Sequence, residues 1–287
     1  MNLRESSLPA GWYPRNPDEI RRFLAGFNKG RAQGSARAAI APHAGWYYSG
    51  KIAAGAAASL SGNVDTLAII GGHLPGGHPP LYAGEDAVRT PFGSMAIDGE
   101  LRAALIRETG GTDDRYRDNT VEVLLPMAHF FFPDARLLWL RFPAEMSSFE
   151  AGGALSATAK KLGRSLAVLA STDLTHYGPN YGFTPKGVGP GALRWMKEIN
   201  DRRFIDAVES GDPAAVLERA ETDRSSCSAG AVLGAMGFAA AVAGNGAARL
   251  LEYGTSAGGS GAGAGTVSDA EIPDSFVGYA SFVFDGN

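Results

Sequence analysis

Short apolar runs alternate along the chain with longer segments in which apolar residues recur every three or four positions. The short runs have the length of buried strands, and the longer segments have the period of helices that bury one face. The expected strands are Ala36–Ala41, Thr66–Ile70, Ala135–Arg141 and Ser165–Ala170. The expected helices are Lys51–Leu60, Asp98–Glu108, Ser148–Leu162, Leu193–Glu209 and Pro213–Ala220. This alternation predicts an α/β fold, a three-layer α/β/α sandwich around a mainly parallel sheet.

The C-terminal third contains an uncharged stretch, Cys227–Gly244, that approaches the length of a membrane span. It consists mostly of alanine and glycine, so it is expected to form a buried core helix. Two further strands are expected at Arg249–Tyr253 and Val277–Phe284, with a flexible glycine-rich surface loop at about 254–266. No helix follows these glycines, which disfavours a dinucleotide site. No interdomain linker precedes the loop, so residues 1–287 are expected to form a single domain.

Composition and charge narrow the classes of partner and compartment. Hydrophobic residues make up 45% of the chain and charged residues 20%, which is enough apolar surface for a sizeable core. The net charge is -4 and no long basic run is present, so nucleic acid is not an expected partner. The only cysteine is Cys227, which rules out an intramolecular disulfide, and the first residues lack the apolar core of a secretory signal. A cytoplasmic protein with no membrane partner is therefore expected.

Three of the five histidines follow expected strands: His43, His73 and His176. The carboxyl ends of parallel strands share one edge of a sheet, where ligands collect, so these side chains can converge in space. Each also has a simpler interpretation, because a histidine before a helix can merely satisfy backbone groups. His78 competes with His73, since the glycine-rich turn around them could present either imidazole.

Asp173 and His176 are three residues apart, and on a helical turn they would share a face. Such a pair can bind a metal, act as an acid/base couple, or orient another ligand, although Asp173 could also simply cap a helix. Cys227 precedes the alanine-rich helix, where helix N–H groups lower a thiol pKa, but a lone cysteine there can also be a small core residue. Two imidazoles and one anionic ligand are typical of non-haem iron(II) sites, while thiolate and imidazole also suit zinc and copper.

These elements together resemble the Memo family (AmmeMemoRadiSam system protein B type), which is related to the class III extradiol ring-cleavage dioxygenases. The resemblance covers nearly the whole chain, and its motifs are Ala10–Pro14, Pro42–Gly45, Val88–Pro91, Ser171–Gly178, Cys227 and Val277–Ala280. It implies an extradiol dioxygenase type of fold, with His43, His73 and Cys227 as metal ligands. It also implies that Asp173 and His176 line the same pocket as catalytic residues.

The chain departs from the family pattern at three places. The usual Gly-Pro-Ser-His turn is the shorter Gly71-Gly-His73, and the segment usually reading Glu-His-Ser-Ile-Glu is Asp118-Asn-Thr-Val-Glu122. Asn119 therefore replaces a histidine, and an amide cannot transfer protons. Leu124 stands where a polar residue is common.

Three functions are compatible with these residues. The first is a non-haem iron dioxygenase or related redox enzyme, in which His176, oriented by Asp173, transfers protons. The second is a non-catalytic module that binds a peptide or a small anion in the same cleft, an option that Asn119 and Leu124 favour. The third is a zinc hydrolase with Glu122 or Asp173 as the base.

Overall fold

The structure is a computed structural model, and it describes residues 2–28, 35–258 and 272–284. In this part of the chain the main sheet has nine strands, in the order β10-β12-β2-β9-β3-β8-β4-β7, with β11 beside β12. Its centre consists of the parallel strands β2 (Ala38–Ala41), β9 (Leu166–Ser171), β3 (Thr66–Leu74) and β8 (Arg136–Pro143). The outer strands are β4 (Leu81–Tyr82), β7 (Thr112–Asp113), β10 (His176–Tyr177), β11 (Arg249–Thr255) and β12 (Phe276–Phe284). β12 runs antiparallel to β2, β10 and β11.

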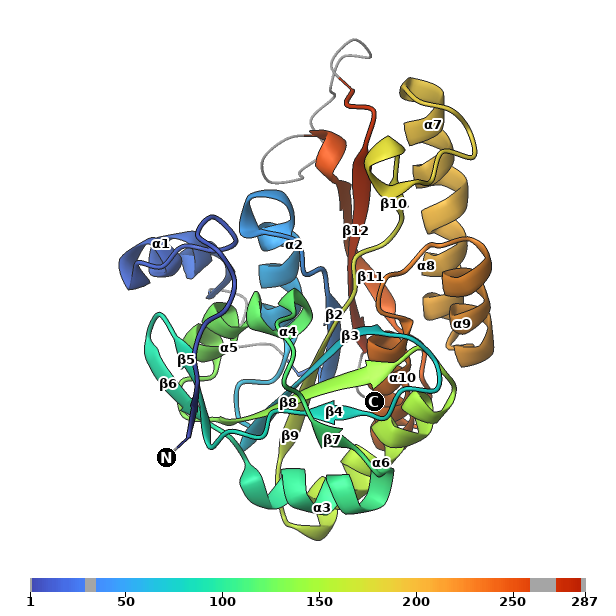
Figure 1. Cartoon of the computed structure of the whole chain (residues 1–287). Helices are drawn as coiled ribbons and strands as arrows, with labels where there is room; N and C mark the ends of the chain where they lie inside the picture. Colours follow the sequence, from blue (N-terminus) through green and yellow to red (C-terminus); the bar gives the residue numbers. More distant parts are fainter. Residues whose placement is uncertain (1, 29–34, 259–271, 285–287) are drawn as a thin grey trace.

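Helices cover both faces of this sheet, as Figure 1 shows. Alternate residues of the central strands point to opposite faces, so Ile40 and Ile70 pack on one side while Leu67 and Ile69 pack on the other. On the first face lie α3 (Gly99–Thr109), α6 (Ser147–Lys161), α8 (Asp201–Ser210), α9 (Pro213–Thr222) and α10 (Ala229–Ala243). On the second face lie α1 (Pro17–Asn28), α2 (Trp46–Ser59), α4 (Asn119–Glu122) and α5 (Leu125–Phe131). The predicted α/β/α sandwich around a mainly parallel sheet is therefore confirmed.

The alanine-rich segment is α10, the most buried helix of the first layer, and residues Ala229–Ala239 are all buried. It packs on α6 at very short range, because a Cβ atom added to Gly152 of α6 would lie 2.0 Å from the carbonyl oxygen of Gly234. The core-helix interpretation of this stretch is confirmed. Among the described residues, no helix combines the length and the apolar character that crossing a membrane requires.

Several elements differ from the sequence-based expectation. Gly254 and Thr255 continue β11, paired with Tyr279 and Gly278, and Ser256–Gly258 form a short 3-10 helix. The flexible loop predicted from about 254 is thus wrong for these residues, because β12 offers them backbone partners; its remainder, from 259 to 266, lies outside the described residues. The expected helix over Leu193–Glu209 is interrupted, with α7 (Pro190–Trp195) joined to α8 by a π-helical segment, Met196–Asn200.

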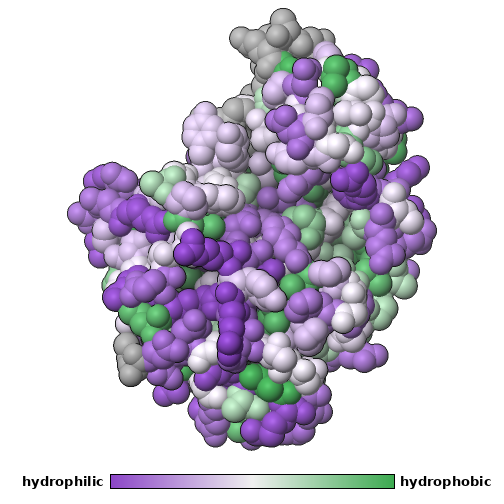
Figure 2. Space-filling model, viewed as in Figure 1, coloured by the Kyte–Doolittle hydropathy of each residue, from purple (hydrophilic) through white to green (hydrophobic). Residues whose placement is uncertain are grey.

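A second, three-stranded sheet, in the order β1-β5-β6, was not predicted from the sequence. It consists of β1 (Leu3–Arg4), β5 (Ala87–Thr90) and β6 (Gly93–Ala96). On the face seen in Figure 2, hydrophilic residues predominate and hydrophobic ones are scattered in small groups. That face therefore presents no single large apolar surface.

Candidate metal centre

His43, His73 and Cys227 converge at the carboxyl edge of the central strands. One potential ligand atom from each residue lies within 4.8 Å of the others. The sulfur of Cys227 is 3.2 Å from Nε2 of His43, and the rings of His43 and His73 meet edge to face with centroids 4.9 Å apart. The structure thus brings together the three residues that the resemblance implies as ligands, from two strand ends and the loop before α10.

His43 is held in one orientation by the strand beside its own. Its backbone N–H donates to Oδ1 of Asp173 at 2.8 Å, and its Nδ1 lies 3.0 Å from the hydroxyl of Ser171. That hydroxyl donates to the carbonyl oxygen of Thr120, so it must accept from Nδ1–H of His43. Nε2 of His43 is then the nitrogen that faces the thiol of Cys227.

His73 lies near the end of β3, within an irregularity in the pairing of β3 with β8 between Gly71 and Leu74. Its φ of 56° is positive, which is unusual for a residue with a side chain. Nδ1 of His73 lies 3.0 Å from Oδ2 of Asp118. Burial alone would lower the pKa of His73, but hydrogen bonds to Asp118 and Cys227 raise it to about 10.

His78, the alternative to His73, does not reach the cluster. Its Nδ1 lies 2.9 Å from the carbonyl oxygen of Pro79, and it lines a different cavity, with Glu108, Glu145 and Glu150. The structure therefore places His73, and not His78, beside His43 and Cys227.

Cys227 stands in the loop just before α10, where its N–H donates to the carbonyl oxygen of Asp173. Burial would raise the pKa of its thiol, but the nearby imidazoles, above all His43, hold that pKa well below its usual range. The sequence pointed to the helix terminus as the cause. The histidines lower the pKa in this structure, and they favour a thiolate at neutral pH.

Asp173 and His176 line the same cavity but do not share a helical turn, so that expectation was wrong. The segment between them has no helical structure, because it pairs with β12: Leu174 N–H donates to the carbonyl oxygen of Gly278, and Gly278 N–H donates to the carbonyl oxygen of Thr175. His176 then begins β10 opposite Val277. Asp173 is almost fully buried, and burial raises its pKa. Oδ2 of its carboxylate lies 3.9 Å from Nε2 of His43. Of the nearby histidines, His43 is therefore the one that Asp173 orients.

His176 contributes a ring nitrogen that has no fixed partner. Its Nε2 is buried and has no hydrogen-bond partner within the described part of the chain, while its ring packs 4.9 Å from that of Tyr181. A buried polar atom without a partner is unusual in a protein, and it indicates a group that a bound molecule satisfies.

Asp201, which the sequence gave no reason to select, supports the segment that carries His176. Its Oδ1 accepts from the N–H and the hydroxyl of Thr175, and its Oδ2 accepts from Tyr253 at 2.7 Å. Asp201 is fully buried at the start of α8, and burial raises its pKa to about 6.

We expect Asp201→Asn to change stability in a pH-dependent way. In the folded state the pKa of Asp201 lies above the ordinary 3.8. The stability that the wild-type side chain provides is therefore complete below pH 3.8 and is lost as the pH rises through about 6. The variant should match the wild type near pH 4 and exceed it by roughly 3 kcal/mol above pH 7. Urea unfolding at several pH values measures this, with Asp206→Asn, on the exposed side of α8, as the control. A difference that does not vary with pH would contradict the expectation.

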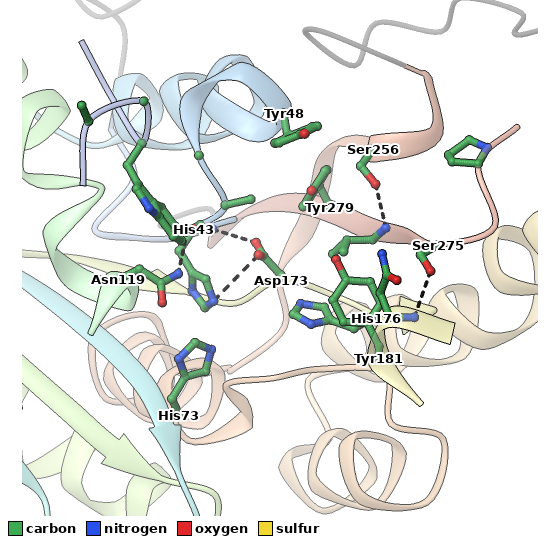
Figure 3. Close-up of a pocket in the computed structure, with 18 residues that line it drawn as sticks. His43, Tyr48, His73, Asn119, Asp173, His176, Tyr181, Ser256, Ser275 and Tyr279 are labelled. Carbon is green, nitrogen blue, oxygen red and sulfur yellow. Dashed lines mark hydrogen bonds and ion pairs between the residues drawn. The ribbon is translucent and has the colours of Figure 1, made fainter. Parts of the chain in front are cut away.

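His43 and His73 line a cavity of about 700 Å³, and the sulfur of Cys227 lies beside them, 3.2 Å from Nε2 of His43. Figure 3 shows His43, His73 and Asp173 from one side of this cavity and His176 and Tyr181 from another. The aromatic lining residues are Trp12, Tyr48, Tyr181 and Tyr279, and no lysine or arginine is among the lining residues that the structure describes. The aromatic lining therefore suits a flat molecule.

Asn119, Glu122 and Leu124 lie in or next to the segment that departs from the family pattern, and they have different roles. Asn119 lines the cavity, and its amide donates to the carbonyl oxygen of His43 at 3.0 Å. Leu124 is a buried core residue away from the cavity. Glu122 is also directed away from it, because its carboxylate accepts from the N–H groups of Ser7 and Leu8 and from the hydroxyl of Tyr13. With these partners Glu122 is not placed to act as the base of a hydrolase.

Comparisons with known proteins agree with the motifs. A family model described as Memo-like protein matches residues 4–283. The MEMO1 family protein MTH_45 of Methanothermobacter thermautotrophicus is 30% identical, covering 88% of this chain and 94% of its own length. The MEMO1 family protein MK0963 of Methanopyrus kandleri is 29% identical over 98% of both chains. A solved structure, the uncharacterized protein JW3007 from Escherichia coli K12, covers 85% of this chain and 99% of its own with a TM-score of 0.47 and 13% identity. The match over residues 4–283 establishes that this chain belongs to the Memo-like family.

Proposed function

We propose that this protein binds one iron(II) ion through His43, His73 and Cys227 and uses it in a non-haem, dioxygenase-like oxidation. The observation that carries the proposal is the convergence of three ligand atoms within 4.8 Å, two of them on histidines that line a cavity. Two imidazoles and one anion are a donor set that iron(II) accepts, and zinc or copper would also fit a set that includes a thiolate. The unpartnered Nε2 of His176 is a further sign that a bound group belongs beside them.

Bound iron(II) would supply a Lewis acid and an electron donor for dioxygen. The chain itself would supply orientation and proton transfer. Ser171 holds the imidazole of His43 in the tautomer that turns Nε2 toward the thiol, and Asp173 fixes the backbone N–H of His43. His176 lines the cavity, so it is the residue placed to transfer a proton to or from a substrate hydroxyl.

The substrate that suits this cavity is a small aromatic alcohol of the catechol type. Trp12, Tyr48, Tyr181 and Tyr279 offer ring faces and hydroxyl groups, which favour a flat, apolar molecule with a few hydroxyls. A thiolate at the centre of the site also suits a reducing compartment, so we propose the cytoplasm.

A second candidate is a non-catalytic module that binds a small molecule or peptide in the same cavity. The observation that favours it is Asn119, whose amide is engaged with the backbone of His43 where the family pattern has a histidine. An amide can fix the loop but cannot transfer a proton.

Metal analysis of protein purified without oxygen or chelators tests the proposal. We expect close to one equivalent of iron(II) after reconstitution of the wild type, almost none in His73→Ala, and wild-type content in His78→Ala, since His78 lines another cavity. Equal metal content in the two variants would contradict the ligand assignment. Metal binding without turnover of catechols would support the binding module.

A further inference from the structure

His73 occupies a backbone conformation that its surroundings must maintain. A positive φ costs a residue with a Cβ atom about 1–2 kcal/mol, and among the described non-glycine residues only His73 and Arg224 have one. The residues before His73 pack closely, since a Cβ atom on Gly71 would lie 2.1 Å from the hydroxyl oxygen of Thr120. The imidazole of His73 is partly exposed, with 31% of the side chain accessible, so packing alone does not fix it.

Arg141, on the neighbouring strand β8, contacts both the backbone and the side-chain partner of His73. It lies opposite Gly71 in the register of β3 and β8, and only 3% of it is exposed, so its guanidinium depends on protein acceptors. Its Nε donates to the carbonyl oxygen of Gly72 at 3.0 Å, and its Nη2 lies 3.2 Å from Oδ2 of Asp118. The same carboxylate oxygen of Asp118 lies 3.0 Å from Nδ1 of His73.

We propose that Arg141 is the positioning residue for the ligand His73, acting through Asp118 and through the carbonyl group of Gly72. This inference rests on the proposed function, because it assigns Arg141 a role in the affinity for the metal. Asp118 accepts the Nδ1–H of His73, which leaves Nε2 as the nitrogen available to a metal. Arg141 fixes that carboxylate and, at the same time, the peptide group next to the strained residue.

The planar guanidinium is essential to this arrangement. It spans three acceptors at once, because Nη1 also lies 3.4 Å from Oδ1 of Asp114, on the side away from His73. A lysine would keep the positive charge but would present one ammonium group, which cannot contact Gly72, Asp118 and Asp114 in the same geometry. Arg141→Lys therefore removes the hydrogen-bond geometry of the guanidinium and keeps its positive charge.

Cobalt(II) affinity, measured by competition with a chromophoric chelator, tests the role of Arg141. We expect Arg141→Lys to weaken cobalt(II) binding by about 10- to 100-fold, the range typical of groups that orient a metal ligand. Arg164→Lys is the matched control, since Arg164 pairs with Asp98 and Glu100 far from the cavity, and its affinity should equal that of the wild type. In a His73→Ala background, Arg141→Lys should cause no further loss, because it acts only through that ligand.

The outcomes separate this inference from the proposed function. If His73→Ala leaves cobalt(II) affinity unchanged, both the ligand assignment and the role of Arg141 are wrong. If His73→Ala weakens cobalt(II) binding but Arg141→Lys does not, only the positioning role is wrong. The same holds if the loss caused by Arg141→Lys adds fully to the loss caused by His73→Ala in the double variant. If metal-free Arg141→Lys does not fold, Asp118→Asn is the second test, because it keeps the shape of the side chain. Asp118→Asn should lower the cobalt(II) affinity about 10-fold when His73 is present and cause no loss in the His73→Ala background.

Discussion

Cys227→Ser is expected to reduce the affinity for iron(II) or cobalt(II) by at least about 100-fold while the protein stays folded. The variant replaces the one anionic ligand of the cluster by a neutral hydroxyl. The pKa of the Cys227 thiol lies well below its usual range, so a thiolate is already present at neutral pH, whereas serine stays protonated. The side chains differ little in size, so α10 and its contacts with α6 should persist.

The measurement is a competition titration, with circular dichroism to verify the fold. Ser226→Ala is the control, because Ser226 lies one residue before Cys227 in the same loop and hydrogen-bonds Thr172 rather than the cluster. Cobalt(II) bound to the wild type should also show a thiolate charge-transfer absorption that the variant lacks. Unchanged affinity in Cys227→Ser would remove the thiolate from the site.

Glu122→Ala is expected to lower the free energy of unfolding by about 3 kcal/mol and to release the N-terminal segment from the cavity wall. The buried carboxylate accepts from the N–H groups of Ser7 and Leu8 and from Tyr13. One hydrogen bond to a charged group contributes about 1.5–3 kcal/mol, and water replaces part of this set once the side chain is removed. Without Glu122, these donors must find water, and the segment that places Trp12 in the cavity loses its attachment.

Urea unfolding measures the loss of stability, and limited proteolysis reports release of the N-terminal segment. Glu108→Ala, at an exposed position on α3, is the control and should change stability by less than about 0.5 kcal/mol. If Glu122→Ala unfolds at the same urea concentration as the wild type and resists protease equally, the carboxylate does not anchor the segment.

The sequence predicted the layered fold and the convergence of His43, His73 and His176 because both depend on one simple rule, whereas Cys227 was added by the resemblance to the Memo family. Apolar runs that alternate with helices form a parallel sheet, and its strand ends meet at one edge. The same rule favoured His73 over His78, because His73 lies nearer the end of the strand, and the structure places His73 at the cluster. This placement depends on β3 continuing to Leu74, which is possible because glycine at 71 and 72 fits against Thr120 and Ser228.

The supporting residues could not be found in the same way. Asp118, Arg141 and Asp201 are ordinary charged residues in the sequence, and their roles come from strand register and burial, which no local pattern specifies. The helix α1 was missed although Pro17 stands at its first position and Asp18 and Glu19 occupy its first turn, which are recognisable start signals. Gly254 was assigned to a loop from composition, whereas pairing with Tyr279 makes it part of a strand.

X-ray absorption spectroscopy at the iron edge, on wild-type protein loaded with iron(II) without oxygen, reports directly whether His43, His73 and Cys227 bind the metal. We predict one sulfur neighbour, from Cys227, together with the multiple-scattering pattern of two imidazoles, from His43 and His73. A spectrum with only oxygen and nitrogen neighbours, unchanged in Cys227→Ser, would show that this metal site is wrong.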